Sequence, residues 1–144
     1  MAGVEEARTG LEATFALMER HFWEPANGLY ADEATPDWQL SAYRGQNANM
    51  HACEAMLAAY EATKEPRYLD RAELLAHNIT RRQAALANGM MWEHYHEDWS
   101  VDWDYNKQDK TNIFRPWGYQ PGHLTEWAKL LLILERHRKL DWLA

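Results

Sequence analysis

Four side chains suited to proton transfer occur as two pairs with the same spacing. His51 and Glu54 form one His-x-x-Glu pair, and His123 and Glu126 form the other. Residues three apart on a helix share a face, so each carboxylate can contact its imidazole. A neutral imidazole near pH 7 can take or give a proton, and a carboxylate partner fixes its tautomer. The pairs predict either acid–base chemistry or core histidines held by capping carboxylates.

The second pair belongs to a helix expected from Pro121 to about His137. Proline suits a first helical turn, where its missing N–H costs nothing. Apolar residues cover most of the circumference of this helix, which predicts that it is buried. They are Leu124, Trp127, Leu130, Leu131, Ile133 and Leu134. His123 and Glu126 would then lie at the mouth of a buried helix.

The first pair belongs to a helix expected from about Asn47 to Thr63. Alanines occur on all of its sides, which indicates an internal helix with close neighbours. Asn47 can cap it. Asn47, His51 and Glu54 also follow the i, i+4, i+7 spacing of a single helix face.

The chain repeats this arrangement. An amphipathic helix from about Val4 to Phe22, ended by Pro25 and Asn27-Gly28, precedes the first pair. A second one, from about Pro66 to Leu86, precedes the other pair. The two histidines are 72 positions apart, as are the two glutamates. The sequence therefore predicts a single domain over residues 1–144. It is built from two helical hairpins, about 1–63 and 64–144, with both loops at one end.

Two loops precede the histidine helices. The first, residues 29–46, is long enough to suggest a functional role. The second contains a stretch after Met91 in which residue types alternate with a period of two, which predicts a short strand or β-hairpin. A metal interpretation competes there because His-x-His can chelate an ion. Its candidate ligands are Glu93, His94, His96, Glu97 and Asp98. Nothing else in the chain directs further ligands to this stretch, so we expect a hairpin and no metal.

Composition narrows the function classes. A formal net charge of −7 argues against a nucleic-acid partner. The chain has no polybasic patch, no apolar run near the ~18 residues of a membrane span, and no signal-peptide core at its start. The lone Cys53 predicts a buried thiol and a cytoplasmic protein. Eight Trp and seven Tyr favour a carbohydrate ligand.

Three segments together resemble the N-acylglucosamine 2-epimerase superfamily, and most closely its branch of mannose isomerases and related aldose–ketose isomerases. They are YRGQNANMHACEAMLAAYEAT, WEHYHEDWSVDWDYN and FRPWGYQPGHLTEWAKLLLIL. The resemblance implies an all-α fold, the (α/α)6 barrel, in which inner and outer helices alternate. The chain is similar to the middle third of that barrel. Early helices that carry a substrate-binding arginine, and late helices that carry a second catalytic histidine, would lie outside this third.

The resemblance also implies an isomerase mechanism and residue roles. The family transfers a proton at C2 of a free sugar through a cis-enediol, with two histidines and no metal or cofactor. It implies catalytic roles for His123 and Glu126. Substrate contacts are implied for Asn47, His51, Arg115, Trp117 and Tyr119. Simple anchoring of the loop is the alternative for the last two.

Three other functions stay open at this point. A 2-epimerase of N-acylglucosamine or an aldose would use the same enediol. A non-catalytic carbohydrate-binding fragment, or one that self-assembles as a homo-oligomer to cover its apolar edges, would use the same helices. A glycoside hydrolase would need two carboxylates, such as Glu126 with Asp102 or Asp104. The His-x-x-Glu pairs favour proton transfer over hydrolysis.

Overall fold

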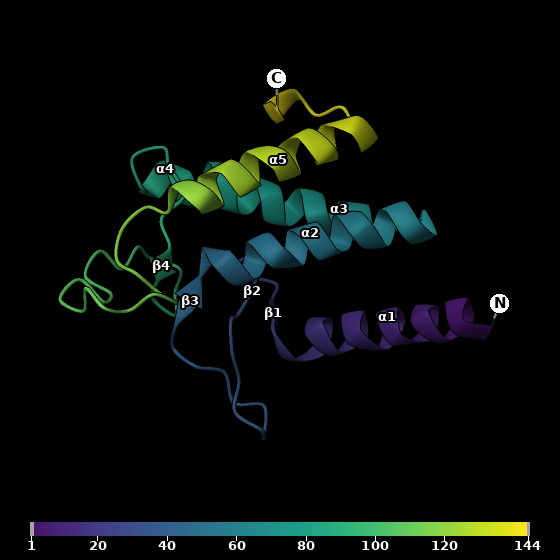
Figure 1. Cartoon of the computed structure of the whole chain (residues 1–144), viewed down its shortest axis with the longest axis horizontal. Coiled ribbons are helices and arrows are strands. Elements are labelled where there is room, and N and C mark those ends of the chain that lie inside the picture. The colour runs from purple at the N-terminus through teal and green to yellow at the C-terminus, as the bar shows by residue number, and fades with distance from the viewer. Residues whose placement is uncertain (1, 144) are drawn as a thin grey trace.

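Four helices of twelve residues or more dominate residues 2–143, the part of the chain that the computed structural model describes. They are α1 (Ala2–His21), α2 (Gln46–Thr63), α3 (Pro66–His77) and α5 (Pro121–His137). α3 continues through a π-helical segment, Asn78–Gln83, into the short α4 (Ala84–Leu86). All four expected helices form, and their ends agree with the sequence prediction to within two residues. α1 and α3 run in one direction, and α2 and α5 run in the other (Figure 1).

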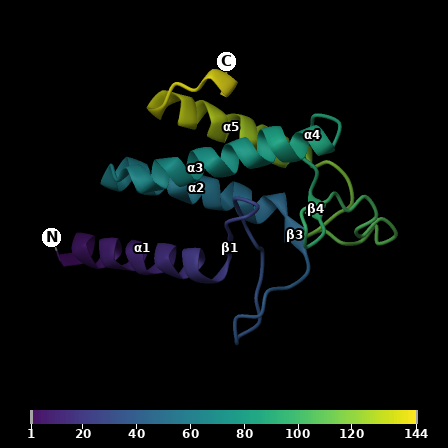
Figure 2. The same cartoon turned by 180° about the vertical axis from the view of Figure 1, so that it is seen from behind.

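The helices pack around α3, which contacts both α2 and α5. α1 meets α3 through the edge of Phe15 on Tyr68, with ring centroids 5.1 Å apart, and through an ion pair between Arg71 and Glu19. The view from behind shows α3 in front of α2 (Figure 2). The fully buried side chains come mainly from α2, α3 and α5. They include Met50, Cys53, Tyr68, Leu75, Trp127, Leu130 and Leu134. Cys53 is a buried free thiol, and burial raises its pKa to about 12.

A short β-hairpin follows α1. β1 (Trp23–Glu24) pairs antiparallel with β2 (Leu29–Tyr30). The dipeptide Asn27-Gly28, expected to end the first helix, instead lies in the turn of this hairpin, because α1 already ends at His21.

The stretch predicted as a strand or hairpin forms β4 (His94–Tyr95). Its ladder partner is β3 (Arg44–Gly45), some fifty residues earlier, in antiparallel register. A single bridge from Tyr95 to Val101 completes a local hairpin. β3 leads directly into α2, so this pairing ties the loop before α5 to the start of α2.

Two expectations about the helices are corrected. Gly45, in extended conformation, is the N-cap residue of α2, so Asn47 lies inside the helix and does not cap it. α5 is not buried all round, because its described neighbours lie on one side only. Trp127 is fully buried, whereas Leu132 is 60% exposed.

Both long connections, residues 22–45 and 87–120, lie at the end of the molecule where α2 and α5 begin (Figure 1). The first turns of α2 and α5 therefore face the same loops, as the repeat predicted. Of the helices in residues 2–143, none combines the length and apolar character needed to cross a bilayer.

Candidate active site

A cavity of about 210 Å³ lies where α2 and α5 begin. Three residues expected in a site line it: Asn47 from the first turn of α2, His123 from the first turn of α5, and Arg115 from the loop before α5. The structure thus brings together side chains that are up to 76 positions apart in the sequence.

His123 is held by a carboxylate from a different element than expected. Its Nδ1 lies 2.9 Å from Oε2 of Glu93, which directly precedes β4. Glu93 is 5% exposed. Burial raises the pKa of Glu93, against the stabilising effect of hydrogen bonds from Gln46 and His123. A buried carboxylate at Nδ1 favours the tautomer with the proton on Nδ1, which leaves the lone pair on Nε2.

Gln46 and Trp127 orient this carboxylate. The indole N–H of Trp127 donates to Gln46 Oε1 at 2.6 Å, which fixes which end of the amide is the nitrogen. Gln46 Nε2 then donates to Glu93 Oε2 at 3.0 Å. It also lies 3.0 Å from His123 Nδ1, because both groups donate to the same oxygen. Gln46 and Trp127 are fully buried, so the network has little freedom to rearrange.

The second histidine of the cavity, His94, has both ring nitrogens occupied. Its Nδ1 lies 3.0 Å from the Tyr43 hydroxyl, and its Nε2 lies 2.9 Å from the carbonyl oxygen of Pro116. The carbonyl can only accept, so Nε2 carries the proton and Nδ1 accepts from Tyr43. Burial lowers the pKa of His94. His94 therefore stays neutral and holds the loop, which leaves His123 as the proton-transfer candidate.

Arg115 supplies a positive charge at the rim of the cavity. Its guanidinium lies 3.0 Å from Glu33 Oε2 and 4.0 Å from the centre of the Tyr43 ring. Burial opposes its charge, but hydrogen bonds to Glu33 and Tyr105 leave the pKa of Arg115 raised. The neighbouring Phe114 also lines the cavity and is 89% exposed.

Trp117 and Tyr119 do not line the cavity. Trp117 donates to the carbonyl of Trp103 at 2.6 Å, and Tyr119 donates to the carbonyl of Ala87 at 3.0 Å. Both rings pack edge-on against Trp92, with centroids 5.7 and 4.9 Å away. Their contacts match the loop-anchoring alternative.

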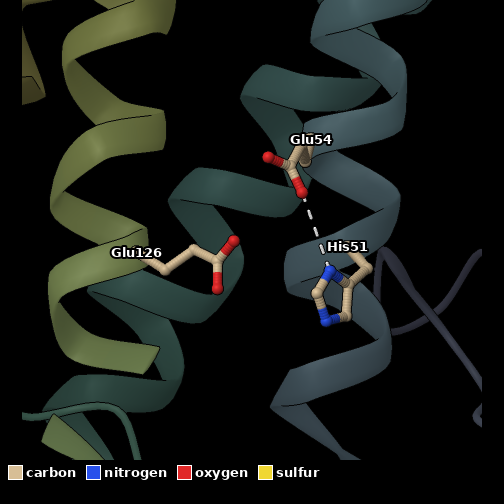
Figure 3. A group of neighbouring side chains, drawn as sticks. All are labelled: His51, Glu54 and Glu126. Atoms are coloured by element: carbon tan, nitrogen blue, oxygen red, sulfur yellow. Dashed lines mark ion pairs between the residues drawn. The ribbon is translucent and has the colours of Figure 1, made fainter. Parts of the chain in front are cut away.

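The other candidates, His51 and Glu126, do not line the cavity but lie near each other, about one helical turn beyond Asn47 and His123. His51 and Glu54 on α2 point toward Glu126 on α5 (Figure 3). Potential ligand atoms of these three residues all lie within 4.8 Å of one another. His51 Nδ1 is 3.7 Å from Glu54, so the first His-x-x-Glu pair touches as expected. Glu126 contacts Lys129 at 3.5 Å, and the carboxylate hydrogen-bonded to His123 is Glu93.

This cluster already has a cation. The Lys129 ammonium lies 2.9 Å from Glu54 and 3.5 Å from Glu126. A divalent ion would have to displace it, and His51 is mostly exposed. The stretch first considered for a metal does not converge either. Its buried members have the partners given above, while His96, Glu97 and Asp98 are exposed.

Comparison with known proteins decides the family. The N-acylglucosamine 2-epimerase (GlcNAc 2-epimerase) family profile matches residues 1–144. The chain belongs to this family. Curated relatives named D-mannose isomerase include proteins of Marinomonas mediterranea, Thermobifida fusca and Pseudomonas cannabina pv. alisalensis. They are 57%, 40% and 34% identical over 97%, 94% and 99% of this chain, and the matches cover 36%, 33% and 36% of the relatives.

The crystal structure of a D-mannose isomerase has the same fold. It superposes with a TM-score of 0.94 at 56% identity, over 99% of this chain and 37% of that chain. The chain thus spans about a third of the length of these relatives. Its four helices correspond to part of the (α/α)6 barrel of the family.

Sequence reasoning missed several polar residues around the cavity of this family member. Gln46 was not considered, and Glu93 was assigned to a metal alternative rather than to His123. Asp32 and Tyr43 were not singled out at all. The pairing of β3 with β4 explains the miss: it brings Gln46, directly after β3, beside Glu93, directly before β4, and no sequence pattern indicated that these two short strands pair.

Proposed function

We propose that this chain forms part of the active site of an aldose–ketose isomerase that acts on free sugars like mannose and fructose. The reaction is a proton transfer through a cis-enediol. The observation that carries the proposal is the bond from His123 to Glu93 at the edge of a cavity. The names of the relatives support the substrate class, and the acidic, loop-lined cavity suits a small polar ligand.

In the proposed reaction the open-chain sugar lies in the cavity with C2 next to His123 Nε2. His123 takes the proton from C2, the C2–H electron pair forms the C1=C2 bond, and the π pair of the C1=O bond moves to the C1 oxygen, which gives an enediolate. Transfer of the hydroxyl proton from O2 to O1 then prepares C2 to become the carbonyl carbon of the ketose. Glu93 stabilises the imidazolium that forms, because its carboxylate lies next to Nδ1, the ring nitrogen that does not take the proton from C2. Arg115 offsets negative charge on the enediolate oxygen. Asn47 contributes an amide that can bond a hydroxyl.

The product depends on which carbon the proton reaches. Its return to C1 gives the ketose, and its delivery to the opposite face of C2 gives the epimer. A 2-epimerase outcome is therefore the nearest alternative, in keeping with the name of the family. Analysis of products from mannose separates the two, because the isomerase gives fructose and the epimerase gives glucose.

His51 and Glu126 have a supporting place in the proposal. They lie together between α2 and α5 (Figure 3), about one helical turn beyond Asn47 and His123, which line the cavity. We infer that they contact sugar hydroxyls rather than orient His123. The proposed compartment is the cytoplasm, in keeping with the free thiol of Cys53.

The test is incubation of the chain with mannose in deuterium oxide, followed by NMR. We expect deuterium at C2 of mannose or at C1 of fructose, and its loss in His123→Ala. Fructose that forms without solvent label would indicate a hydride shift. A chain that binds mannose yet never exchanges the C2 proton would contradict the assignment of His123 as the base.

A further inference from the structure

Asp32 is a cavity carboxylate that the proposed proton transfer does not use. It follows β2 and lines the cavity with His123 and Arg115. The backbone before it is fixed by the buried Asn49. Asn49 accepts from the N–H of Tyr30 at 2.8 Å and donates to the Tyr30 carbonyl at 2.9 Å. The position of Asp32 is therefore set by the start of α2.

One carboxylate oxygen of Asp32 is committed to the backbone. Oδ2 accepts from the N–H of Gly45, the N-cap residue of α2, at 2.6 Å. Within residues 2–143, this is the only hydrogen bond that the Asp32 side chain makes. Oδ1 therefore retains its capacity to accept.

The free oxygen lies close to the backbone of Gly45 and to the side chain of Tyr43. A Cβ added at Gly45 would lie 2.8 Å from Asp32 Oδ1 and 2.7 Å from the Tyr43 hydroxyl oxygen. A side chain at position 45 would therefore displace one or both oxygens, and glycine leaves both residues where they line the cavity. The Tyr43 hydroxyl proton already goes to His94 Nδ1. Both oxygens can therefore accept a hydrogen bond, and neither has a proton to donate when Asp32 is ionised.

The surrounding charges favour a hydroxyl donor over a cation or an anion. Arg115 is near enough to affect the charge of Asp32, but its hydrogen bonds go to Glu33 and Tyr105. The carboxylates of Asp32 and Glu93 line the same cavity and would repel a phosphate or an acid group. A bulky ammonium would compete with the neighbouring guanidinium. A sugar hydroxyl is neutral, small and able to donate.

We propose that Asp32 determines sugar specificity by accepting, through Oδ1, a hydrogen bond from one hydroxyl that takes no part in the C1–C2 proton transfer. The proposal rests on the proposed function, because it assumes a sugar in this cavity. A site built around an acceptor for one hydroxyl discriminates strongly against a sugar that lacks this group, since the acceptor is then desolvated without a partner.

The experiment is a thermodynamic cycle in which the charge of Asp32 and one sugar hydroxyl are removed separately and together, and binding is compared. Mannose and its 3-deoxy, 4-deoxy and 6-deoxy analogues are titrated by calorimetry into the wild-type chain and Asp32→Asn. The matched control is Asp37→Asn, which removes the same charge from an exposed position of the same loop. Asparagine retains the shape of aspartate and an oxygen for the Gly45 N–H, so the fold is expected to persist.

We expect Asp32→Asn to weaken mannose binding by about 10- to 100-fold, the range for a hydrogen bond to a charged group. One deoxy analogue should bind the wild type with a similarly reduced affinity, and its affinity should fall little further in Asp32→Asn. Asp37→Asn should behave as the wild type. The wild-type preference for mannose over that analogue should also grow as the pH rises through 7, because ionised Asp32 is the stronger acceptor.

The proposal is overturned if Asp32→Asn binds mannose as tightly as the wild type. It is also overturned if each of the three deoxy analogues binds more weakly than mannose by the same factor in the wild type as in Asp32→Asn. Gly45→Ala is a second variant, because its methyl group would crowd Asp32 Oδ1 and the Tyr43 hydroxyl and displace them from the cavity wall. It should remove the same discrimination while circular dichroism stays unchanged. Deuterium exchange at C2 is measured separately, so failure of the Asp32 proposal is distinguishable from failure of the isomerase proposal.

Discussion

The Oε2 atom of Glu93 lies 2.9 Å from Nδ1 of His123, although the two residues belong to different elements and are 30 positions apart. The pairing of β3 with β4 produces this contact, because it places Glu93 beside the start of α2, next to Gln46. The imidazole of His123, the proposed proton-transfer group, is thus oriented from the loop, and the helix that carries it supplies only its position.

Glu93→Gln should change the tautomer of His123. Without the carboxylate, Nδ1 loses its strongest proton acceptor, so the fraction of imidazole with the proton on Nε2 should rise. This is measured by nitrogen-15 NMR of the histidine ring. The rate of C2 proton exchange should fall roughly 100-fold, while mannose affinity changes little.

The matched control for this prediction is Glu97→Gln, an exposed carboxylate in the same loop. It should leave both the ring nitrogen shifts and the exchange rate unaltered. An unchanged His123 tautomer in Glu93→Gln would show that the bond seen in the structure does not orient the imidazole.

Lys129→Met should raise the pKa of Glu54. In the structure, a hydrogen bond from Lys129 is the largest cause of the lowered pKa of Glu54, and His51 adds a smaller effect. Carbon-13 NMR titration of the carboxyl group should show the pKa returning toward its ordinary value of 4.5. Lys139→Met, which removes a lysine paired with Glu135, is the control and should leave Glu54 unaffected. Equal titration curves in all three proteins would exclude an interaction between Lys129 and Glu54 in solution.

The helices were predictable from sequence because apolar periodicity, prolines and glycines act locally. α5 begins at Pro121, and the segment from Pro66 to Leu86 is helical throughout, as expected. The partners of the site residues could not be predicted from the sequence, because they depend on pairing between distant strands. His123 and Glu126 share a helix, yet Glu126 turns to Lys129 and His123 to a loop carboxylate. Helical spacing states which residues can touch, and tertiary contacts decide which do.

Asp32 should make the folded chain less stable as the pH rises from about 4 to about 7. Burial is the main cause that raises the pKa of Asp32 from 3.8 to about 7 in the folded chain. Between these values the folded state retains a proton that the unfolded state has released. The free energy of unfolding then falls with pH, by at most about 1.4 kcal/mol per pH unit. Above pH 7 this contribution is constant.

Urea unfolding at several pH values measures this effect. Asp32→Asn cannot titrate, so its stability relative to the wild type should increase across the same pH range. Asp37→Asn is the control and should track the wild type. Parallel curves for the wild type and Asp32→Asn would mean that Asp32 titrates alike in the folded and unfolded chain.

Gly28→Ala should destabilise the fold by about 2 kcal/mol. Gly28 has a φ of +63° in the turn between β1 and β2, and a side chain there costs about 1 kcal/mol. The new methyl group would also lie 2.5 Å from Asn78 Nδ2, which donates to the Gly28 carbonyl at 2.8 Å. Moving Asn78 breaks this buried bond, which adds about 1 kcal/mol.

Gly10→Ala tests the opposite sign in the same chain. Gly10 lies inside α1, and an added Cβ would meet nothing within 4 Å. Alanine there should stabilise the chain by roughly 0.5–1 kcal/mol, since glycine loses more backbone freedom in a helix. Urea midpoints should therefore move in opposite directions for the two variants. Equal shifts of the urea midpoint in the two variants would show that neither the positive φ of Gly28 nor its contact with Asn78 determines the stability cost of a side chain in the turn.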